Sequence, residues 1–320
     1  MGRIVILVSN TLSVARRTQL GAIRAKVAPS LVGLAVWVVV AALLPAPLAA
    51  RVFLLAPLVI VPRLLALCPD RGLVTRIAGW PTLIGAFPLV LAFGLPTGPL
   101  AGMLVLPWLA IALAAMAAAT ADGLGRLTRL RAGARLAAIP ELGLDAALGF
   151  WAVGAIFVLV DRVGIATPFP TVIVLLTATH FHFAGLGLLG LTSLLARSRA
   201  WLRASVVGLI AGIPLTALGF VVAINPVNSL GAGLVGLSGM GVGLALLTVT
   251  TPGERHWASR VAGAALLISM PLAIGWSLTI LTGEAFLDLD TMIRTHGELN
   301  ALAVLLGVAG YATQPLEAPS

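Results

Sequence analysis

Long apolar runs separated by short polar seams make up most of the chain. A helix of about 20 apolar residues is long enough to cross the roughly 30 Å hydrocarbon core of a bilayer. The pattern therefore predicts an all-α, polytopic transmembrane helix bundle of about ten spans. These segments, bounded by Pro, Gly or Arg, lie near residues 28–44, 48–68, 77–95, 100–119, 141–160, 171–195, 204–224, 230–250, 261–281 and 291–312.

Composition agrees with this class of protein. Hydrophobic residues make up 60% of the chain and charged residues only 10%, whereas soluble domains carry roughly 25% charged residues. No polar stretch is long enough to fold outside the membrane, so residues 1–320 are expected to form one integral domain with the lipid bilayer as its main partner. The single cysteine, Cys68, allows no intramolecular disulfide and no thiolate cluster for zinc.

The basic residues predict an orientation. Of the 20 Lys and Arg residues, 17 lie before the first segment or in the alternate seams after the second, fourth, sixth and eighth. Short loops rich in Lys and Arg stay in the cytoplasm, so both termini, including the basic segment 1–27, are predicted to be cytoplasmic. This distribution explains the net charge of +9 without a nucleic acid, which is not expected as a partner.

Two stretches have a distinctive local pattern. Leucines and arginines alternate in the predicted cytoplasmic loop 121–140, as in an amphipathic helix lying on an anionic leaflet. A solvated basic loop is an equal alternative, because Gly125 and Gly133 weaken a helix. In the eighth segment, six glycines between residues 231 and 243 favour close helix packing over a flexible gating helix.

Few polar side chains are expected at membrane depth. His180 and His182 lie in the sixth segment, and His296 and Asn300 lie in the tenth. Ionisable groups in the hydrocarbon are costly and usually face a cavity or a partner, so these residues form a candidate binding site. The alternative is a structural hydrogen bond between helices, worth about 1 kcal/mol.

Helix geometry limits how these four residues combine. Two residues on an α-helix differ by about 200°, so His180 and His182 point to nearly opposite sides, whereas His296 and Asn300 share a face. From Thr171, His180 lies about 13 Å deep, a depth similar to that of Asn300. The sixth and tenth helices are therefore predicted to meet, with only one of the two histidines, His180 by its depth, facing the tenth.

Acidic residues form two further groups. Glu141 and Asp145 share a face at the cytoplasmic start of the fifth segment, which indicates a possible inner site or acids favoured by the helix dipole. Around the start of the tenth segment, four acids accompany Arg294 and would form a negative vestibule for a cation. The alternative is that Asp290 caps the helix and the other three acids are simply solvated. These four acids are Glu284, Asp288, Asp290 and Glu298.

Two short motifs resemble those of a known family. The sequence H-F-H-F-A at 180–184 and the sequence T-H-G-E-L-N-A at 295–301 are similar to the paired motifs of the YndJ-like family of bacterial membrane proteins. The resemblance implies a polytopic protein of the bacterial inner membrane, of a kind often described as a transporter. It implies no substrate.

Three functions are compatible with these residues. The first is transport of a small solute or cation through a substrate-binding site of His180, His182, His296 and Asn300. The second is a membrane-embedded metal- or haem-dependent enzyme, although the chain has only four histidines and none of the dense histidine boxes of a di-iron enzyme. The third is a structural or lipid-organising membrane protein. The sequence assigns no catalytic residue, metal, cofactor or oligomeric state.

The orientation generates the first prediction. In a Cys68→Ser background, single cysteines beside Asp161, Asn228 and Asp288 should react with an impermeant thiol reagent added from outside. Cysteines near Gly72 and Gly253 should react only after permeabilisation. The reversed labelling pattern would show that the termini face the outside.

Overall fold

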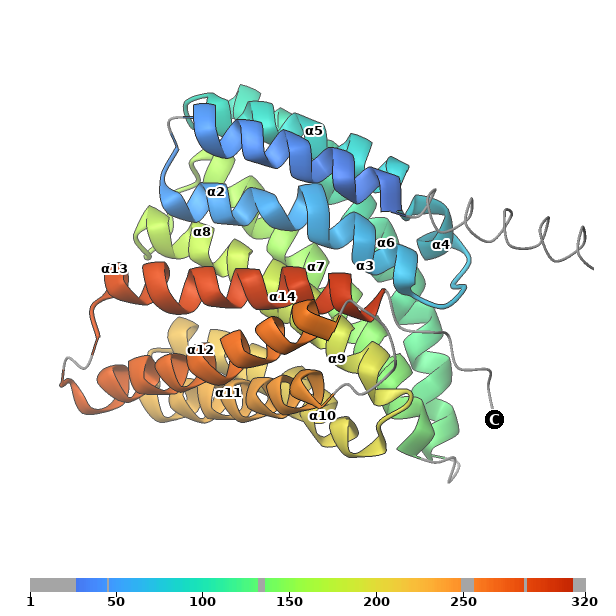
Figure 1. Ribbon diagram of the computed structural model, residues 1–320. Coiled ribbons are helices and arrows are strands. Elements are labelled where there is room, and N and C mark those ends of the chain that lie inside the picture. The colour runs from blue at the N-terminus through green and yellow to red at the C-terminus, as the bar shows by residue number, and fades with distance from the viewer. Residues whose placement is uncertain (1–26, 45, 132–135, 249–255, 285–286, 313–320) are drawn as a thin grey trace, which may run out of the picture.

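The computed structural model describes residues 27–44, 46–131, 136–248, 256–284 and 287–312. The described part of the chain is helical and contains no strand. Most of the long helices run alongside one another, so that their ends gather at two opposite ends of the bundle (Figure 1). We call these the α3–α4 end and the α7–α8 end, after the connections found there.

The helices follow one another with short connections. After a first apolar helix, Val27–Leu43, they are α2 (Leu48–Leu55), η1 (Ala56–Ile60), α3 (Val61–Leu67), α4 (Leu73–Ile77), α5 (Trp80–Gly94), α6 (Pro99–Arg131), η2 (Leu136–Ala138), α7 (Ile139–Val163), α8 (Thr171–His180), η3 (Phe181–Leu188), α9 (Leu189–Ala196), η4 (Ala200–Leu202), α10 (Arg203–Val221), α11 (Asn225–Leu247), α12 (His256–Thr282), α13 (Leu289–Met292), η5 (Ile293–Gly297) and α14 (Glu298–Tyr311).

The prediction of an all-α membrane protein is confirmed, since seven of the described helices are long and apolar enough to cross a membrane. Two more apolar helices, Val27–Leu43 and α5, are shorter. The predicted loop 121–140 differs in form, because α6 continues as one helix to Arg131. Residues 132–135 of that loop and residues 1–26 of the predicted basic N-terminal segment lie outside the described residues.

Three of the long helices contain a π-helical segment, namely η1, η3 and η5. Proline accounts for the first of them. Pro62 has no N–H with which to bond the carbonyl of Leu58, four residues earlier, so the regular ladder is interrupted there. Gly33 lets the first helix approach this carbonyl closely, since a Cβ atom at Gly33 would lie only 1.8 Å from the Leu58 oxygen.

The continuous helix α8–η3–α9 is the centre of the bundle. Every residue from Phe181 to Ala196 is buried. A Cβ atom at Gly185 would lie 2.7 Å from Phe150 of α7, and one at Gly187 would lie 2.6 Å from Val304 of α14. Glycine is therefore required where these neighbours approach the central helix, because it lacks the Cβ atom that would separate the backbones.

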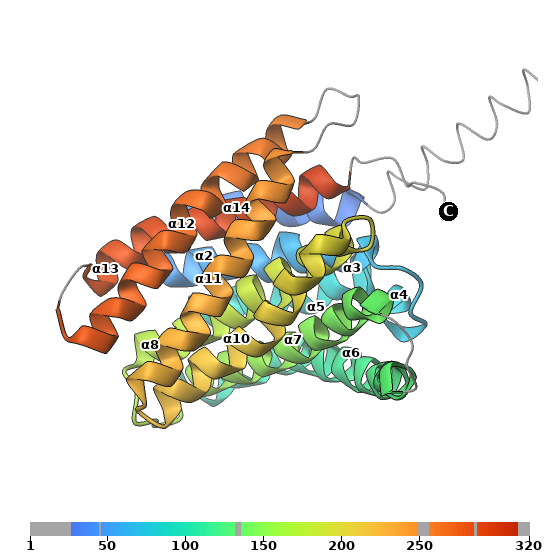
Figure 2. The ribbon, with the colours of Figure 1, turned by 90° about the horizontal axis from the view of Figure 1, so that it is seen from below.

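Helices α10, α11 and α12 lie side by side along one flank of the bundle (Figure 2). Small residues allow this packing: a Cβ atom at Gly243 of α11 would lie 2.9 Å from the Gly263 oxygen of α12. A Cβ atom would lie closer still at two other glycines of α11, 2.3 Å from the Thr216 nitrogen at Gly231 and 2.6 Å from the Met270 sulfur at Gly239. The prediction that the glycines of the eighth segment serve close packing is confirmed at these positions, whereas Gly233 has open space around it.

The central packing generates a stability prediction. Gly187→Ala should lower the free energy of unfolding by about 1–3 kcal/mol, because the added methyl overlaps Cγ1 of the stiff Val304 side chain. The measurement is thermal unfolding of the purified protein in detergent. Gly149→Ala in α7 is the matched control, since a Cβ atom there meets nothing within 4 Å.

Val304→Ala should restore part of the stability that Gly187→Ala removes, because it deletes the methyl that causes the overlap. Equal unfolding temperatures for Gly187→Ala and Gly149→Ala would contradict the close approach of η3 and α14.

Candidate functional site

His180 and His296 come together from helices far apart in the sequence. Their ring centroids lie 6.4 Å apart, with 19° between the ring planes. His180 is the last residue of α8, directly before η3, and His296 lies within η5. The prediction that the sixth and tenth helices meet is confirmed, since α14 contacts η3 as well.

Backbone carbonyls orient both rings. Nδ1 of His180 lies 2.8 Å from the carbonyl oxygen of Leu176 in its own helix. Nδ1 of His296 lies 2.8 Å from the carbonyl oxygen of Ser269 in α12, two residues before the helix proline Pro271. A carbonyl only accepts hydrogen bonds, so Nδ1 carries the proton in both rings and Nε2 is left for other partners.

The two rings differ in exposure. His296 is buried, whereas His180 is exposed at the surface of the chain. His180 thus lies at the surface of the helix bundle, while His296 is held against α12. Neither ring has a carboxylate partner among the described residues.

Asn300 is the third member of this group. It lies four residues after His296, which places both on one face of the helix. The side chain is buried, and its Oδ1 has no hydrogen-bond partner among the described residues. A buried amide oxygen without a donor costs roughly 1–3 kcal/mol, which indicates that a further group satisfies it.

His182 points away from this group, as the helical phase predicted. Nδ1 of His182 donates to the carbonyl of Ala178 at 2.8 Å, and Nε2 accepts the indole N–H of Trp108 at 3.1 Å. The ring is fully buried and packs edge-on against Phe53, with centroids 5.0 Å apart. Both ring nitrogens are thus engaged by the protein itself, on the side of α2 and α6.

Trp108 is the partner that sequence reasoning missed. It lies within a long apolar helix, so hydropathy alone marks it as a core residue. The only available signal was chemical: a buried indole N–H needs an acceptor, and few acceptors exist at this depth. Trp151, 5.1 Å from Trp108 between ring centroids, has no partner for its own Nε1 among the described residues.

The acidic residues before α14 divide between two roles. Asp288 caps α13 by accepting the backbone N–H of Thr291 at 2.8 Å, and this hydrogen bond lowers the pKa of Asp288. The cap is thus Asp288 and not Asp290, which instead pairs with Arg294 at 2.8 Å. Glu284 and Glu298 are exposed.

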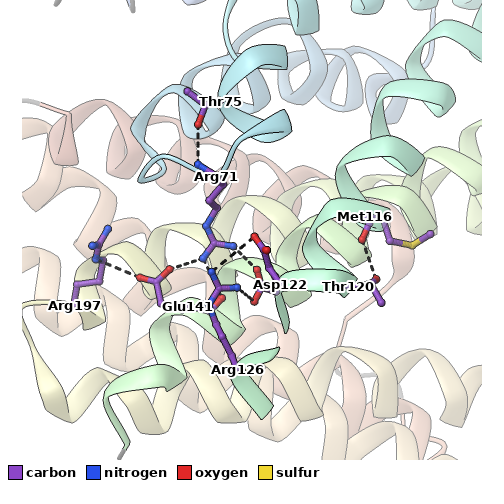
Figure 3. A network of polar contacts seen from close by, with 9 residues as sticks. Arg71, Thr75, Met116, Thr120, Asp122, Arg126, Glu141 and Arg197 are labelled. Carbon is purple, nitrogen blue, oxygen red and sulfur yellow. Dashed lines mark hydrogen bonds and ion pairs between the residues drawn. The ribbon is translucent and has the colours of Figure 1, made fainter. Parts of the chain in front are cut away.

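Glu141 and Asp145 belong to a separate ion-pair network at the α3–α4 end (Figure 3). Arg71, just before α4, pairs with Asp145 and with Oε2 of Glu141, the latter at 2.5 Å. Arg126 of α6 also pairs with Asp145, at 2.5 Å, and Arg197 reaches Glu141 at 3.6 Å. The network ties together the ends of α3, α6, α7 and α9.

The charges of this network compensate one another. The side chain of Arg71 is only 2% exposed and that of Asp145 only 7%. Burial alone would lower the pKa of Arg71, but the charges of Asp145 and Glu141 outweigh it and raise the pKa. Glu141 lies in the first turn of α7, so the helix dipole favours its charge as well.

The sequence-predicted residues thus form two groups and one separate residue. His180 and His296 face each other with Asn300 one helical turn beyond His296, and Glu141 and Asp145 gather at the α3–α4 end. His182 stands apart from both. The sequence placed Arg71 and Arg126 only in loops predicted to be cytoplasmic and gave them no partners. The carboxylates of Glu141 and Asp145, near the start of one helix, were the signal that could have indicated arginine partners.

Within the described ranges, no group of three or more His, Cys, Asp or Glu side chains is placed to hold a metal ion.

The family model described as YndJ-like protein matches residues 51–304, which is well over half of the chain. No match was found among the curated proteins or among the solved structures.

The ion-pair network generates a prediction about Arg71. Arg71→Ala should lower the free energy of unfolding by about 3 kcal/mol, because it leaves the buried Asp145 with only Arg126 as a partner. Arg76→Ala is the matched control, since Arg76 is exposed in α4 and its loss should cost less than about 0.5 kcal/mol. Both are measured by thermal unfolding in detergent. Similar losses in the two variants would contradict a structural role for the Arg71 pair.

Proposed function

The chain belongs to the YndJ-like family, and we propose that it is a multi-pass protein of the bacterial inner membrane that binds and moves a small solute or cation. In this proposal the chain crosses the membrane about ten times, with both termini in the cytoplasm. The α3–α4 end then faces the cytoplasm and the α7–α8 end faces the outside.

The observation that carries the proposal is the facing pair of His180 and His296. Their rings lie 6.4 Å apart between centroids, neither Nε2 has a partner among the described residues, and one ring is exposed. The Nδ1 bond from His296 to Ser269 already joins two helices, but it uses only one of the two ring nitrogens. The unused Nε2 atoms, together with Oδ1 of Asn300, favour a bound solute.

Irregular backbone near these residues supports the same function. His296 lies within η5, His180 directly precedes η3, and η1 contacts both η3 and α14. π-helical segments often occur at functional sites, and irregular backbone at membrane depth is tolerated where it is buried in protein or lines a cavity. Three such segments therefore mark this level of the bundle.

The two polar groups suggest how movement would be controlled. The histidine pair lies within the helices, whereas the Arg71 network joins α6 and α7 to the α3–α4 connection through buried ion pairs. In this proposal, these ion pairs close the bundle at its cytoplasmic end. Release on the cytoplasmic side would then require the ion pairs of Glu141 and Asp145 to separate.

Binding can be tested with a small panel of simple solutes. A solute that binds only the folded protein raises its unfolding temperature. We expect at least one probe among ammonium, potassium, sodium, urea and glycerol to stabilise the wild-type protein, and to do so much less in His180→Asn and His296→Asn. Asparagine retains an amide N–H near the Nδ1 position but removes Nε2, so the helix contacts should survive.

His256→Asn is the matched control, because His256 begins α12 in the seam predicted to be cytoplasmic and should respond as the wild type. His182→Asn should instead lower stability without any ligand, since it removes the acceptor for Trp108. Metal and haem analysis of the same preparation tests the enzyme alternative. The proposal is wrong if no probe stabilises the protein, or if both histidine variants respond as the wild type does.

A further inference from the structure

We infer that the solute bound at His180, His296 and Asn300 is a small ammonium-type cation, recognised through its N–H groups. This inference rests on the proposed function, because it names the class of solute for the same site. It follows from which atoms of the three side chains remain unused, and from the proton positions that their contacts require.

Each imidazole presents an acceptor. Nδ1 of His180 and of His296 must carry a proton, because each faces a backbone carbonyl oxygen at 2.8 Å. In the neutral ring, Nε2 then has a lone pair and no hydrogen.

Asn300 adds a third acceptor. Its Oδ1 is buried and has no hydrogen-bond partner among the described residues, and an amide oxygen only accepts hydrogen bonds. The three unused atoms are therefore two imidazole nitrogens and one amide oxygen. A ligand that satisfies them must donate hydrogen bonds.

The protein contains an example of the donor that such an acceptor takes. At His182 the same arrangement occurs, with Nδ1 donating to the carbonyl of Ala178. There the protein supplies the donor itself, because the indole N–H of Trp108 lies 3.1 Å from Nε2. No described residue donates to Nε2 of His180 or of His296, so at these positions the N–H would come from the ligand.

An ammonium ion fits better than a neutral solute. Amides, urea and alcohols carry acceptor oxygens as well as donors, and of the three side chains only Asn300, through its amide N–H groups, could donate to such an oxygen. An ammonium group has only donors, so three of its N–H groups can meet the three unused acceptors and it brings no acceptor of its own that could be left unpaired.

The surroundings favour a positive charge. Glu284, Asp288, Asp290 and Glu298 lie close in sequence to His296, and Arg294 is the one basic residue among them. Neither Asp288 nor Glu298 forms an ion pair among the described residues. A cation that approaches this end of α13 and α14 therefore meets a net negative surface.

The test compares ammonium with potassium, which has nearly the same radius and the same charge but no N–H. The apparent dissociation constant of each is obtained from the unfolding temperature of the full chain at increasing concentration, with ionic strength held constant by sodium chloride. Ammonium should bind at least about tenfold more tightly than potassium, because only ammonium satisfies the unused acceptors. Methylammonium should bind, and tetramethylammonium, which has no N–H, should not.

The preference for ammonium should disappear in His180→Asn and in Asn300→Leu and persist in His256→Asn. Equal binding of ammonium and potassium, with loss of both in His180→Asn, would overturn this inference and leave the proposed cation site intact. Stabilisation by urea or glycerol and not by ammonium would also overturn it, while the proposed solute site would stand. If no probe of any kind binds, both proposals are wrong.

Discussion

The structure depends on one constraint, which is that polar groups at membrane depth must be satisfied without water. Three histidines meet it by donating their Nδ1–H to the backbone carbonyls of Leu176, Ala178 and Ser269. Each such bond fixes the proton on Nδ1 and leaves Nε2 as an acceptor. The need to satisfy one ring nitrogen therefore determines what the other nitrogen presents.

The same constraint separates neutral polar groups from charged ones. Where the chain buries full charges, it pairs them: Arg71 and Arg126 surround Asp145, and Arg162 lies 2.7 Å from Asp161. The imidazoles and Asn300 carry no such partners, so they are tolerated as neutral groups that need only hydrogen bonds. The bundle thus has a charged network at the α3–α4 end and a neutral polar group within the helices.

Close packing around the central helix brings the neutral group together. Gly187 of η3 allows Val304 of α14 to approach, and this contact places the helix of His296 and Asn300 against that of His180. Larger residues on either side would hold the helices apart, and the imidazole rings would not face each other. His180 and His182 are the same residue type, but their positions in the fold differ. His180 is exposed, whereas His182 is buried and has hydrogen-bond partners for both ring nitrogens.

The sequence by itself determined the helical class, the approximate bounds of the helices and the opposite directions of His180 and His182. These follow from hydropathy and from the 100° step per residue, which are local properties of the chain. Tertiary structure alone decided that the indole N–H of Trp108 donates to His182, that Nδ1 of His296 donates to the carbonyl of Ser269 and that Arg71 pairs with Asp145. Such contacts depend on how helices distant in sequence are placed and rotated. Because lipid is as apolar as the helix faces, hydropathy does not fix this rotation, and side-chain packing decides it.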